Sequence, residues 1–190
     1  MSKKAILAIL DGWGIGTNPE VSAIAQANTP FIDSCYKNFP NTTLEASGIA
    51  VGLPSAQMGK SEVGHMNLGA GRVVYQNLVK LNMAVENATL GKENVITQAF
   101  EYALLNRKKV HFIGLVSDGG VHSHISHLKG LLEVAENFGL EKTFVHAFTD
   151  GRDVDPKSGI GFIADLETFL STKKAKLASV IGRYYAMDRD

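Results

Sequence analysis

The fold is predicted mainly by residues 110–116, VHFIGLV, a largely apolar run that ends in the turn sequence Ser-Asp-Gly-Gly. A continuous run of this length is typical of a strand buried on both faces in a parallel sheet. Three further runs have the same character and are predicted as strands: Ala5–Leu10, Thr143–Phe148 and Leu177–Ile181.

Apolar residues between these runs recur at the spacing of one helix face. This pattern predicts helices over Asn94–Asn106, Ile125–Phe138 and Ser158–Leu170. Strands that alternate with helices of this length indicate βαβ units. We therefore expect an α/β fold, with a mostly parallel sheet and flanking helices.

The first third of the chain has a different composition. Residues 12–71 are rich in Gly, Asn, Ser and Thr and contain four prolines. Short helices fit at Val21–Ala27 and Phe31–Phe39, and a third is expected to begin near Ser61. A long Gly-rich segment in a compact chain is usually functional. The composition shifts near residues 72–76, which predicts two domains, 1–75 and 76–190.

Composition excludes several classes of protein. The 190 residues carry 19 basic and 19 acidic side chains, so the net charge removes the electrostatic argument for general nucleic-acid binding. Cys35 is the single cysteine, which excludes an intramolecular disulfide and favours a cytoplasmic location. No apolar run reaches the roughly 18 residues of a membrane-spanning helix. We expect no nucleic-acid or membrane partner.

Two polar residues in the first third are candidates for chemistry. Asp11 follows the first predicted strand, where a carboxylate can hold a metal ion or simply end the strand in an Asx turn. Ser61 lies in MGKSEVGH (residues 58–65), which fails as a P-loop because Pro54 stands where the motif needs glycine. Ser61 is either a helix N-cap or a serine placed where a helix N-terminus stabilises an anion.

Further candidates follow the later strands. His122, His124 and His127 come after the run 110–116, and three readings are open: metal ligands, a single histidine that acts on substrate, or surface histidines at a helix start. Arg152, Arg183 and Arg189 follow the next two strands. Guanidinium groups at one sheet edge suit a carboxylate or phosphate ligand, but surface ion pairs such as Arg152 with Asp153 remain an alternative.

Five motifs occur in a fixed order along the chain. They are DGWG (11–14), QMGKSEVGH (57–65), SDGGVHSH (117–124), TDGRD (149–153) and GRYYAMDRD (182–190). Together they closely resemble the cofactor-independent (2,3-bisphosphoglycerate-independent) phosphoglycerate mutases, a family of the alkaline phosphatase superfamily. The resemblance covers the whole chain.

The resemblance implies a function and a set of roles. The family interconverts 2-phosphoglycerate and 3-phosphoglycerate in glycolysis and gluconeogenesis with two divalent metal ions, commonly Mn²⁺. By resemblance, Asp11 is a metal ligand, and Ser61 is both the nucleophile that forms a phosphoserine and a metal ligand. The substrate-handling residues implied in the same way are His122, Arg152, Asp153, Arg183 and Arg189. The family also implies a small-molecule substrate as partner and a monomer when full length.

Two features depart from the family. Lys60 stands where members usually have asparagine, which alters the charge beside Ser61. The chain is also much shorter than family members. We therefore expect an N-terminal fragment in which residues 1–75 are part of a phosphatase-like metal-binding domain and 76–190 part of an inserted transferase-like domain. The remaining metal ligands are expected in the absent C-terminal part. A related metal-dependent phosphatase or sulfatase, or a non-catalytic fragment that binds an anionic metabolite, remain the alternatives.

Overall fold

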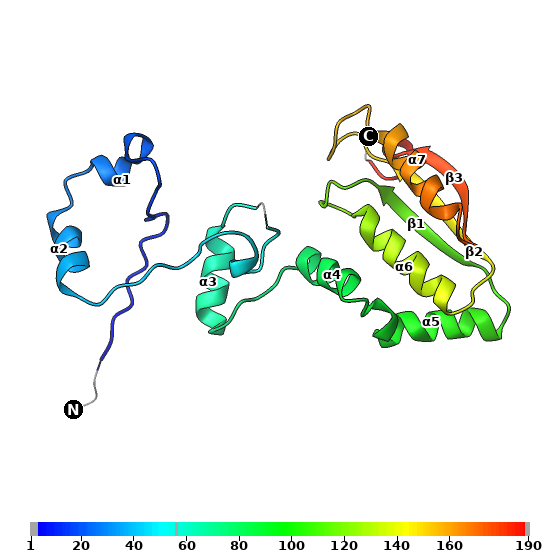
Figure 1. Ribbon diagram of the computed structural model, residues 1–190, viewed down its shortest axis with the longest axis horizontal. Coiled ribbons are helices and arrows are strands. Elements are labelled where there is room, and N and C mark those ends of the chain that lie inside the picture. The colour runs from blue at the N-terminus through cyan, green and yellow to red at the C-terminus, as the bar shows by residue number, and fades with distance from the viewer. Residues whose placement is uncertain (1–3, 56, 189–190) are drawn as a thin grey trace. The chain divides into compact units, whose positions relative to one another are not determined.

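The computed structural model describes residues 4–55 and 57–188 (Figure 1). The chain divides into two compact units, Met1–Val74 and Tyr75–Asp190. Each unit has a buried apolar cluster of its own.

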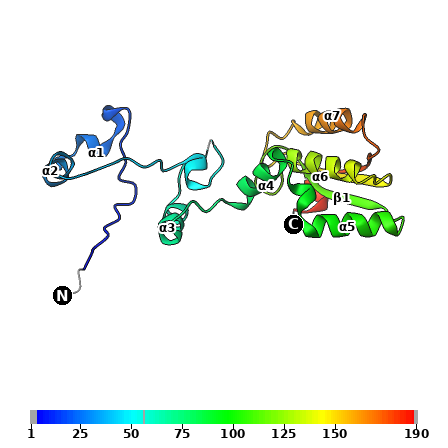
Figure 2. The ribbon, with the colours of Figure 1, turned by 60° about the horizontal axis from the view of Figure 1, so that its bottom comes forward.

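The second unit is built on a parallel sheet of three strands in the order β1-β2-β3. The strands are β1 (Val110–Val116), β2 (Thr143–Thr149) and β3 (Lys176–Gly182). Helices connect or precede them: α5 (Asn94–Leu105), α6 (Ile125–Asn137) and α7 (Gly159–Leu170) (Figure 2). The predicted α/β class is confirmed, and these predicted strands and helices end within one residue of the observed ones.

The main core lies between the sheet and helices α6 and α7. Leu132 of α6, Leu166 of α7 and Val145 of β2 are each at most 1% exposed and belong to one cluster. A second cluster joins α5 to α6, and in it Phe100 contacts the rings of Phe112 and Phe138 edge-on. Helix packing on the sheet therefore fixes where the carboxyl ends of the strands lie.

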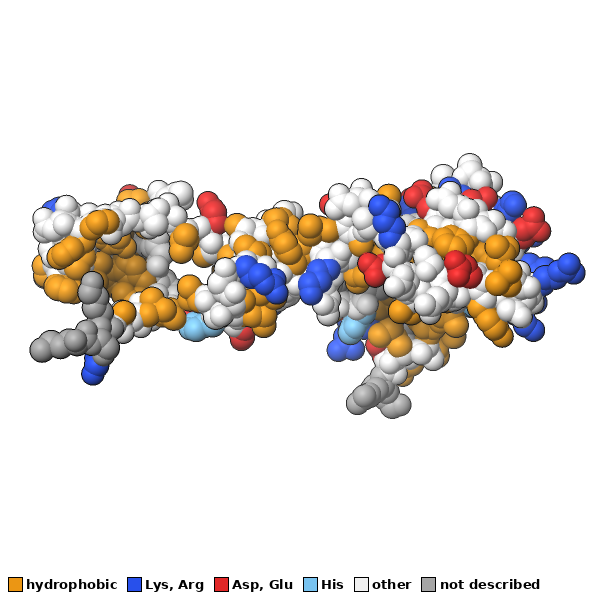
Figure 3. All heavy atoms as spheres, turned by 90° about the horizontal axis from the view of Figure 1, so that it is seen from below, with side chains coloured by type: hydrophobic (Ala, Val, Ile, Leu, Met, Phe, Trp, Pro, Cys, Tyr) orange, Lys and Arg blue, Asp and Glu red, His pale blue; other side chains and the backbone are white. Residues whose placement is uncertain are grey.

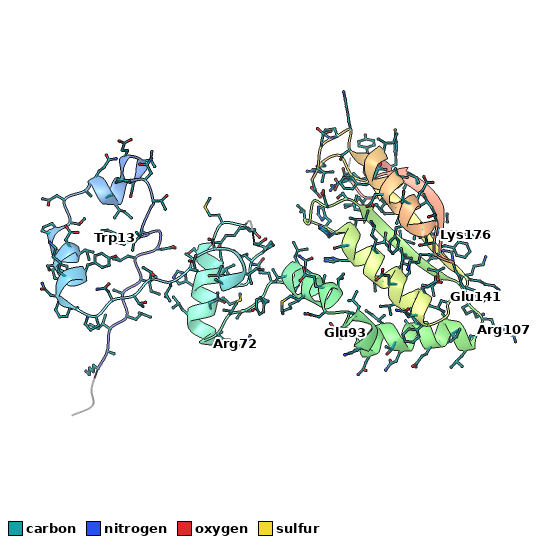
Figure 4. All side chains as sticks on the ribbon, viewed as in Figure 1. Trp13, Arg72, Glu93, Arg107, Glu141 and Lys176 are labelled. Carbon is teal, nitrogen blue, oxygen red and sulfur yellow. The ribbon has the colours of Figure 1, made fainter. Side chains whose placement is uncertain are left out.

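Two helices of this unit were not predicted from the sequence. The first, α4 (Asn77–Glu86), has apolar residues all around its axis, and Val79 is its buried residue, so it has no clear apolar stripe. The second, α8 (Arg183–Ala186), is a single turn directly after β3. The described residues end soon after it, at Asp188. A short 3₁₀ turn, η3 (Leu90–Lys92), precedes α5. Figure 4 shows Arg107 just beyond the C-terminal end of α5.

The first unit consists of short helices and loops. Its elements are η1 (Pro19–Val21), α1 (Ala23–Gln26), α2 (Pro30–Asn38), η2 (Gly48–Val51) and α3 (Ser61–Ala70). The predicted helix start at Ser61 is confirmed, as is the helix near 31–39. The helix predicted over 21–27 is shorter, because Ser22 caps α1 through its side chain after the 3₁₀ turn. Arg72 lies just beyond α3 in Figure 4, after Gly71 ends the helix in the left-handed conformation.

The predicted strand Ala5–Leu10 is wrong. These residues have no regular secondary structure, and the side chains of Ile6 and Leu7 are 96% and 76% exposed. A strand needs a neighbour to pair with its backbone N–H and C=O groups. Within residues 4–55 and 57–188, all the strands lie in the second unit. Apolar side chains are accordingly visible on the surface (Figure 3).

Candidate functional site

Ser61 is the first residue of α3, at the point where a tight loop enters the helix. Lys60 is the N-cap, with no side-chain cap hydrogen bond, so the interpretation of Ser61 as N-cap is wrong. Two residues earlier, a Cβ atom on Gly59 would lie 1.8 Å from the carbonyl oxygen of Ala46. Only glycine fits this close approach, which therefore fixes the path of the chain into Ser61.

The Ser61 side chain contacts a residue 50 positions earlier in the chain. Its hydroxyl donates a hydrogen bond to Oδ2 of Asp11 at 2.5 Å. Asp11 lies in a turn, and the next residue, Gly12, has a positive φ of 79°. The structure thus brings together the two residues of the first unit that the sequence singled out.

His65 completes this group, although no sequence motif predicted it. It lies one helical turn after Ser61, with Nδ1 at 3.3 Å from Ser61 Oγ and 2.8 Å from the carbonyl oxygen of Ser61. The sequence signal that could have indicated His65 was its spacing of four residues from Ser61, because this spacing within a helix places both side chains on one face.

The donor set of Asp11 and Ser61 suits a hard divalent cation in part. A carboxylate and a hydroxyl oxygen are oxygen ligands of the kind that Mg²⁺ and Mn²⁺ prefer. In the described part of the chain, no three His, Cys, Asp or Glu side chains gather as a metal site. The unit can therefore supply two ligands to a metal centre.

The second polar cluster lies at the carboxyl edge of the sheet. Val116 pairs with Thr149, and Thr149 pairs with Gly182, so the three strands end level with one another. The residues that come next are Ser117, Asp150 and Arg183. This level ending brings residues from three distant stretches of sequence within hydrogen-bond distance.

Arg183 is the centre of this cluster and is buried, with 6% of its side chain exposed. Its Nη1 donates to Asp150 at 2.8 Å and to Asp153 at 3.0 Å, and its Nε donates to Asp188 at 2.9 Å. The hydrogen bonds to Asp188 and Asp150 raise the pKa of Arg183 above its usual range, against the opposing effect of burial. Arg183 is thus a fixed positive charge held by three carboxylates.

Asp150 is the most enclosed of these carboxylates, with 2% of its side chain exposed. Burial alone would raise the pKa of Asp150. Hydrogen bonds from Ser117 Oγ at 2.7 Å, from the backbone N–H groups of Asp153 and Arg152, and from Arg183 instead hold that pKa well below its usual range. Asp150 is therefore a charged residue that organises the turn after β2.

The remaining predicted substrate residues lie around this cluster. His122 Nε2 is 3.8 Å from Oδ2 of Asp153, and about half of the His122 side chain is exposed. Arg152 is 71% exposed, and its guanidinium lies 3.9 Å from Asp188 rather than beside Asp153. Arg189 lies outside the described residues. The structure thus places His122, Arg152, Asp153 and Arg183 at one sheet edge.

The other two histidines have local partners. His124 is the N-cap of α6 and accepts a hydrogen bond from the backbone N–H of Ser126. His127 Nε2 lies 2.6 Å from Oδ1 of Asn82 on α4, and burial followed by the proximity of His124 lowers the pKa of His127. Together with His122, they line a pocket of about 230 Å³ beside β1 and α6. His124 and His127 thus both have hydrogen-bond partners within the second unit.

Three members of the cluster were not predicted from the sequence: Ser117, Asp150 and Asp188. Each of the first two is the residue directly after a strand, and that position was the available signal. Asp150 belongs to the motif TDGRD (149–153), but an Asp-Gly pair after a strand is also typical of an ordinary turn.

The chain matches the model of a known protein family. Residues 81–190 match the family model described as the BPG-independent PGAM N-terminus, where PGAM denotes phosphoglycerate mutase. The chain belongs to this family.

Named relatives extend the similarity to the whole chain. The chain is 65% identical over 190 residues to a 2,3-bisphosphoglycerate-independent phosphoglycerate mutase of Flavobacterium psychrophilum, and 50% identical over 192 residues to one of Clostridium perfringens. Each match covers 100% of this chain and 38% of the relative. The chain thus spans well under half the length of these curated relatives.

A solved structure supports the fold. The crystal structure of Leishmania mexicana phosphoglycerate mutase at low cobalt concentration is 36% identical with a TM-score of 0.62, and the match covers 87% of this chain and 32% of that one. Among the residues that the structure describes, no helix is long and apolar enough to cross a membrane.

Proposed function

We propose that this chain supplies the N-terminal part of a 2,3-bisphosphoglycerate-independent phosphoglycerate mutase. In this proposal, the complete protein interconverts 2-phosphoglycerate and 3-phosphoglycerate through a phosphoserine at Ser61, as an isomerase of glycolysis and gluconeogenesis. The observation that carries the proposal is the contact between Ser61 Oγ and Asp11, which joins two distant motifs at 2.5 Å.

Asp11 and Ser61 would hold one of two divalent metal ions, with Mn²⁺ as the expected ion. When bound, the metals favour the ionised serine oxygen and neutralise charge on the phosphoryl oxygens. The further ligands that such a centre needs come from outside the described residues, because Asp11 and Ser61 are two ligands. Asp11 holds the Ser61 side chain in a single orientation, which keeps Oγ ready for attack.

Bonds and protons balance over the two half-reactions. Ser61 gives up its hydroxyl proton and its Oγ forms a bond to the phosphorus of phosphoglycerate, while the bond from phosphorus to the substrate's oxygen breaks and that glycerate oxygen takes up a proton. After glycerate turns, its other hydroxyl gives up a proton and attacks the phosphoserine, and Ser61 Oγ leaves and regains a proton. Exclusion of water separates this isomerisation from hydrolysis.

The cluster at the sheet edge would handle the glycerate part. Two of its charges, on Arg152 and Arg183, face three carboxylates, those of Asp150, Asp153 and Asp188. Because Arg183 already binds these three carboxylates, its proposed role is to hold Asp153 and the loop after β2 in place. The exposed guanidinium of Arg152 and the ring of His122 are the groups open to an anionic substrate. Arg189 is proposed to add a further positive charge.

The division of labour follows from these two groups of residues. Residues 1–75 are proposed to be part of a phosphatase-like metal-binding domain, and residues 76–190 part of a transferase-like substrate domain. We propose that the complete enzyme is cytoplasmic and monomeric. It acts on a small-molecule substrate and has neither nucleic acid nor membrane as a partner.

A chimera tests the proposal directly. Residues 1–190 replace the matching part of the Flavobacterium psychrophilum relative, and the interconversion of the two phosphoglycerates is followed by ³¹P NMR with Mn²⁺ present. The chimera should be active, and Ser61→Ala should abolish turnover. The matched control is Ser34→Ala in α2, whose hydroxyl bonds to the carbonyl oxygen of Phe31 in the same helix, and it should retain activity. Release of inorganic phosphate without isomer formation would instead favour a hydrolase.

A further inference from the structure

We propose that His65 acts as a fixed hydrogen-bond donor to the oxygen of Ser61, a role that deepens the proposed function and rests on it. The two residues lie four positions apart on α3, so their side chains share one helix face. His65 Nδ1 contacts both oxygens of Ser61, the carbonyl oxygen at 2.8 Å and Oγ at 3.3 Å.

The contact with the carbonyl oxygen determines which ring nitrogen carries hydrogen. A carbonyl oxygen only accepts hydrogen bonds, so Nδ1 must donate at 2.8 Å. His65 is therefore in a form with hydrogen on Nδ1. Ser61 Oγ lies on the same helix face, 3.3 Å from this Nδ1.

The Ser61 hydroxyl has the complementary arrangement. Its hydrogen points to Oδ2 of Asp11, which leaves the lone pairs of Oγ free to accept. Asp11 thus takes the donor side of the hydroxyl, and His65 takes the acceptor side. This excludes His65 Nδ1 as the base that receives the serine proton, because that nitrogen already carries one.

This placement has a consequence for the transfer reaction. Negative charge develops on Oγ when the hydroxyl loses its proton before the attack on phosphorus, and again when the phosphoserine returns its phosphoryl group and Oγ leaves. A donor already oriented at that oxygen stabilises both states without reorganisation. The bond to the carbonyl oxygen holds the ring in place, so the donor stays aimed while its hydrogen remains on nitrogen throughout.

The size of the effect follows from the geometry. Removal of one preorganised donor from a developing oxyanion typically costs about a hundredfold to a thousandfold in rate. The 3.3 Å separation is longer than that of a strong hydrogen bond. We therefore expect a loss of about tenfold to a hundredfold in the rate of phosphoserine formation.

The test compares two replacements of His65 in the chimera. Asparagine places an N–H donor close to the position of Nδ1, whereas leucine has similar size and no donor. His65 is exposed, so neither change disturbs the core. In single-turnover experiments, His65→Leu should lower the rate of Ser61 phosphorylation by about tenfold to a hundredfold. In steady-state experiments, its KM should be little changed. His65→Asn should restore the rate to within about fivefold of the parent. A leucine variant as fast as the parent, or an asparagine variant as slow as the leucine variant, overturns the proposal.

A second measurement does not depend on catalysis. Nitrogen-15 NMR of the chimera with labelled histidine, with the His65 signal assigned by its loss in His65→Asn, reports which ring nitrogen carries hydrogen. The expected result is hydrogen on Nδ1 when the ring is neutral, and hydrogen on Nε2 overturns the donor role. If the parent chimera lacks mutase activity, the proposed function fails, while the NMR result still decides the contact.

Discussion

Asp150→Asn removes one charge from the cluster at the sheet edge and keeps the shape of the side chain. In the parent, the carboxylate accepts hydrogen bonds from Ser117 Oγ, from Arg183 Nη1 and from two backbone N–H groups of the following turn. Asparagine retains one acceptor oxygen but replaces the other with a donor. The buried guanidinium then loses one of three ionic partners, while Asp153 and Asp188 remain.

The expected cost can be bounded. Removal of one partner from a buried ion pair typically costs about 3–5 kcal/mol. Because two carboxylates still pair with Arg183, the loss of unfolding free energy in Asp150→Asn should lie at the lower end of this range, at about 3 kcal/mol. With a urea m-value of about 2 kcal/mol/M, the unfolding midpoint should fall by about 1.5 M.

The pH dependence gives this prediction its sharper test. The pKa of Asp150 is lowered in the folded state, so its charge stabilises the fold above the unfolded pKa of about 3.9. That stability is lost as pH falls through the lower folded pKa. Urea unfolding of residues 1–190, followed by circular dichroism, should show the full gap between parent and variant at pH 7 and a narrowing gap below about pH 4. A gap that is absent at pH 7, or the same at pH 3, refutes the reasoning.

Three further predictions concern the core and the two sites. Leu166→Ala, at a fully buried position on α7, should lower the free energy of unfolding by about 2–5 kcal/mol. Ile160 on the same helix is 83% exposed, so Ile160→Ala should change that free energy by less than about 0.5 kcal/mol. Equal effects of the two substitutions in urea unfolding would contradict the assignment of Leu166 to the core. Gly59→Ala forces a Cβ against a backbone oxygen and should lower chimera turnover by about a hundredfold, whereas Gly64→Ala, with open space around it, should leave turnover within a few-fold, and steady-state kinetics on both variants checks this. Arg152→Gln should raise the chimera's KM for phosphoglycerate by about tenfold with kcat within a few-fold, and an unchanged KM would remove Arg152 from the substrate site.

Much of the second unit could be predicted from the sequence, because its strands are short apolar runs bounded by turn residues. The run 110–116 is observed as β1 with the same bounds. The segment Ala5–Leu10 has the same apolar character and yet forms no strand. The pattern reports how apolar a segment is, whereas a strand also requires a hydrogen-bonding neighbour, which local sequence does not encode.

The sites show a similar division. Position after a strand drew attention to the loop around Arg152 and to Arg183. It could not show that Arg183 is buried among three carboxylates, because these pairings depend on the register of the strands and on the turn after β2. In the first unit, Asp11 and Ser61 are 50 residues apart, and the short helices between them do not predict their contact. His65 went unnoticed because a histidine one turn along a helix has no distinct pattern of its own.

The central claim is that Ser61 carries the phosphoryl group during turnover. The most direct measurement is to quench the Mn²⁺-loaded chimera rapidly in the presence of 3-phosphoglycerate and to locate phosphate by peptide mass spectrometry. We expect phosphate on Ser61 that appears and decays at the rate of isomerisation and is missing in Ser61→Ala. Interconversion of the two phosphoglycerates with no phosphate on Ser61 would contradict it.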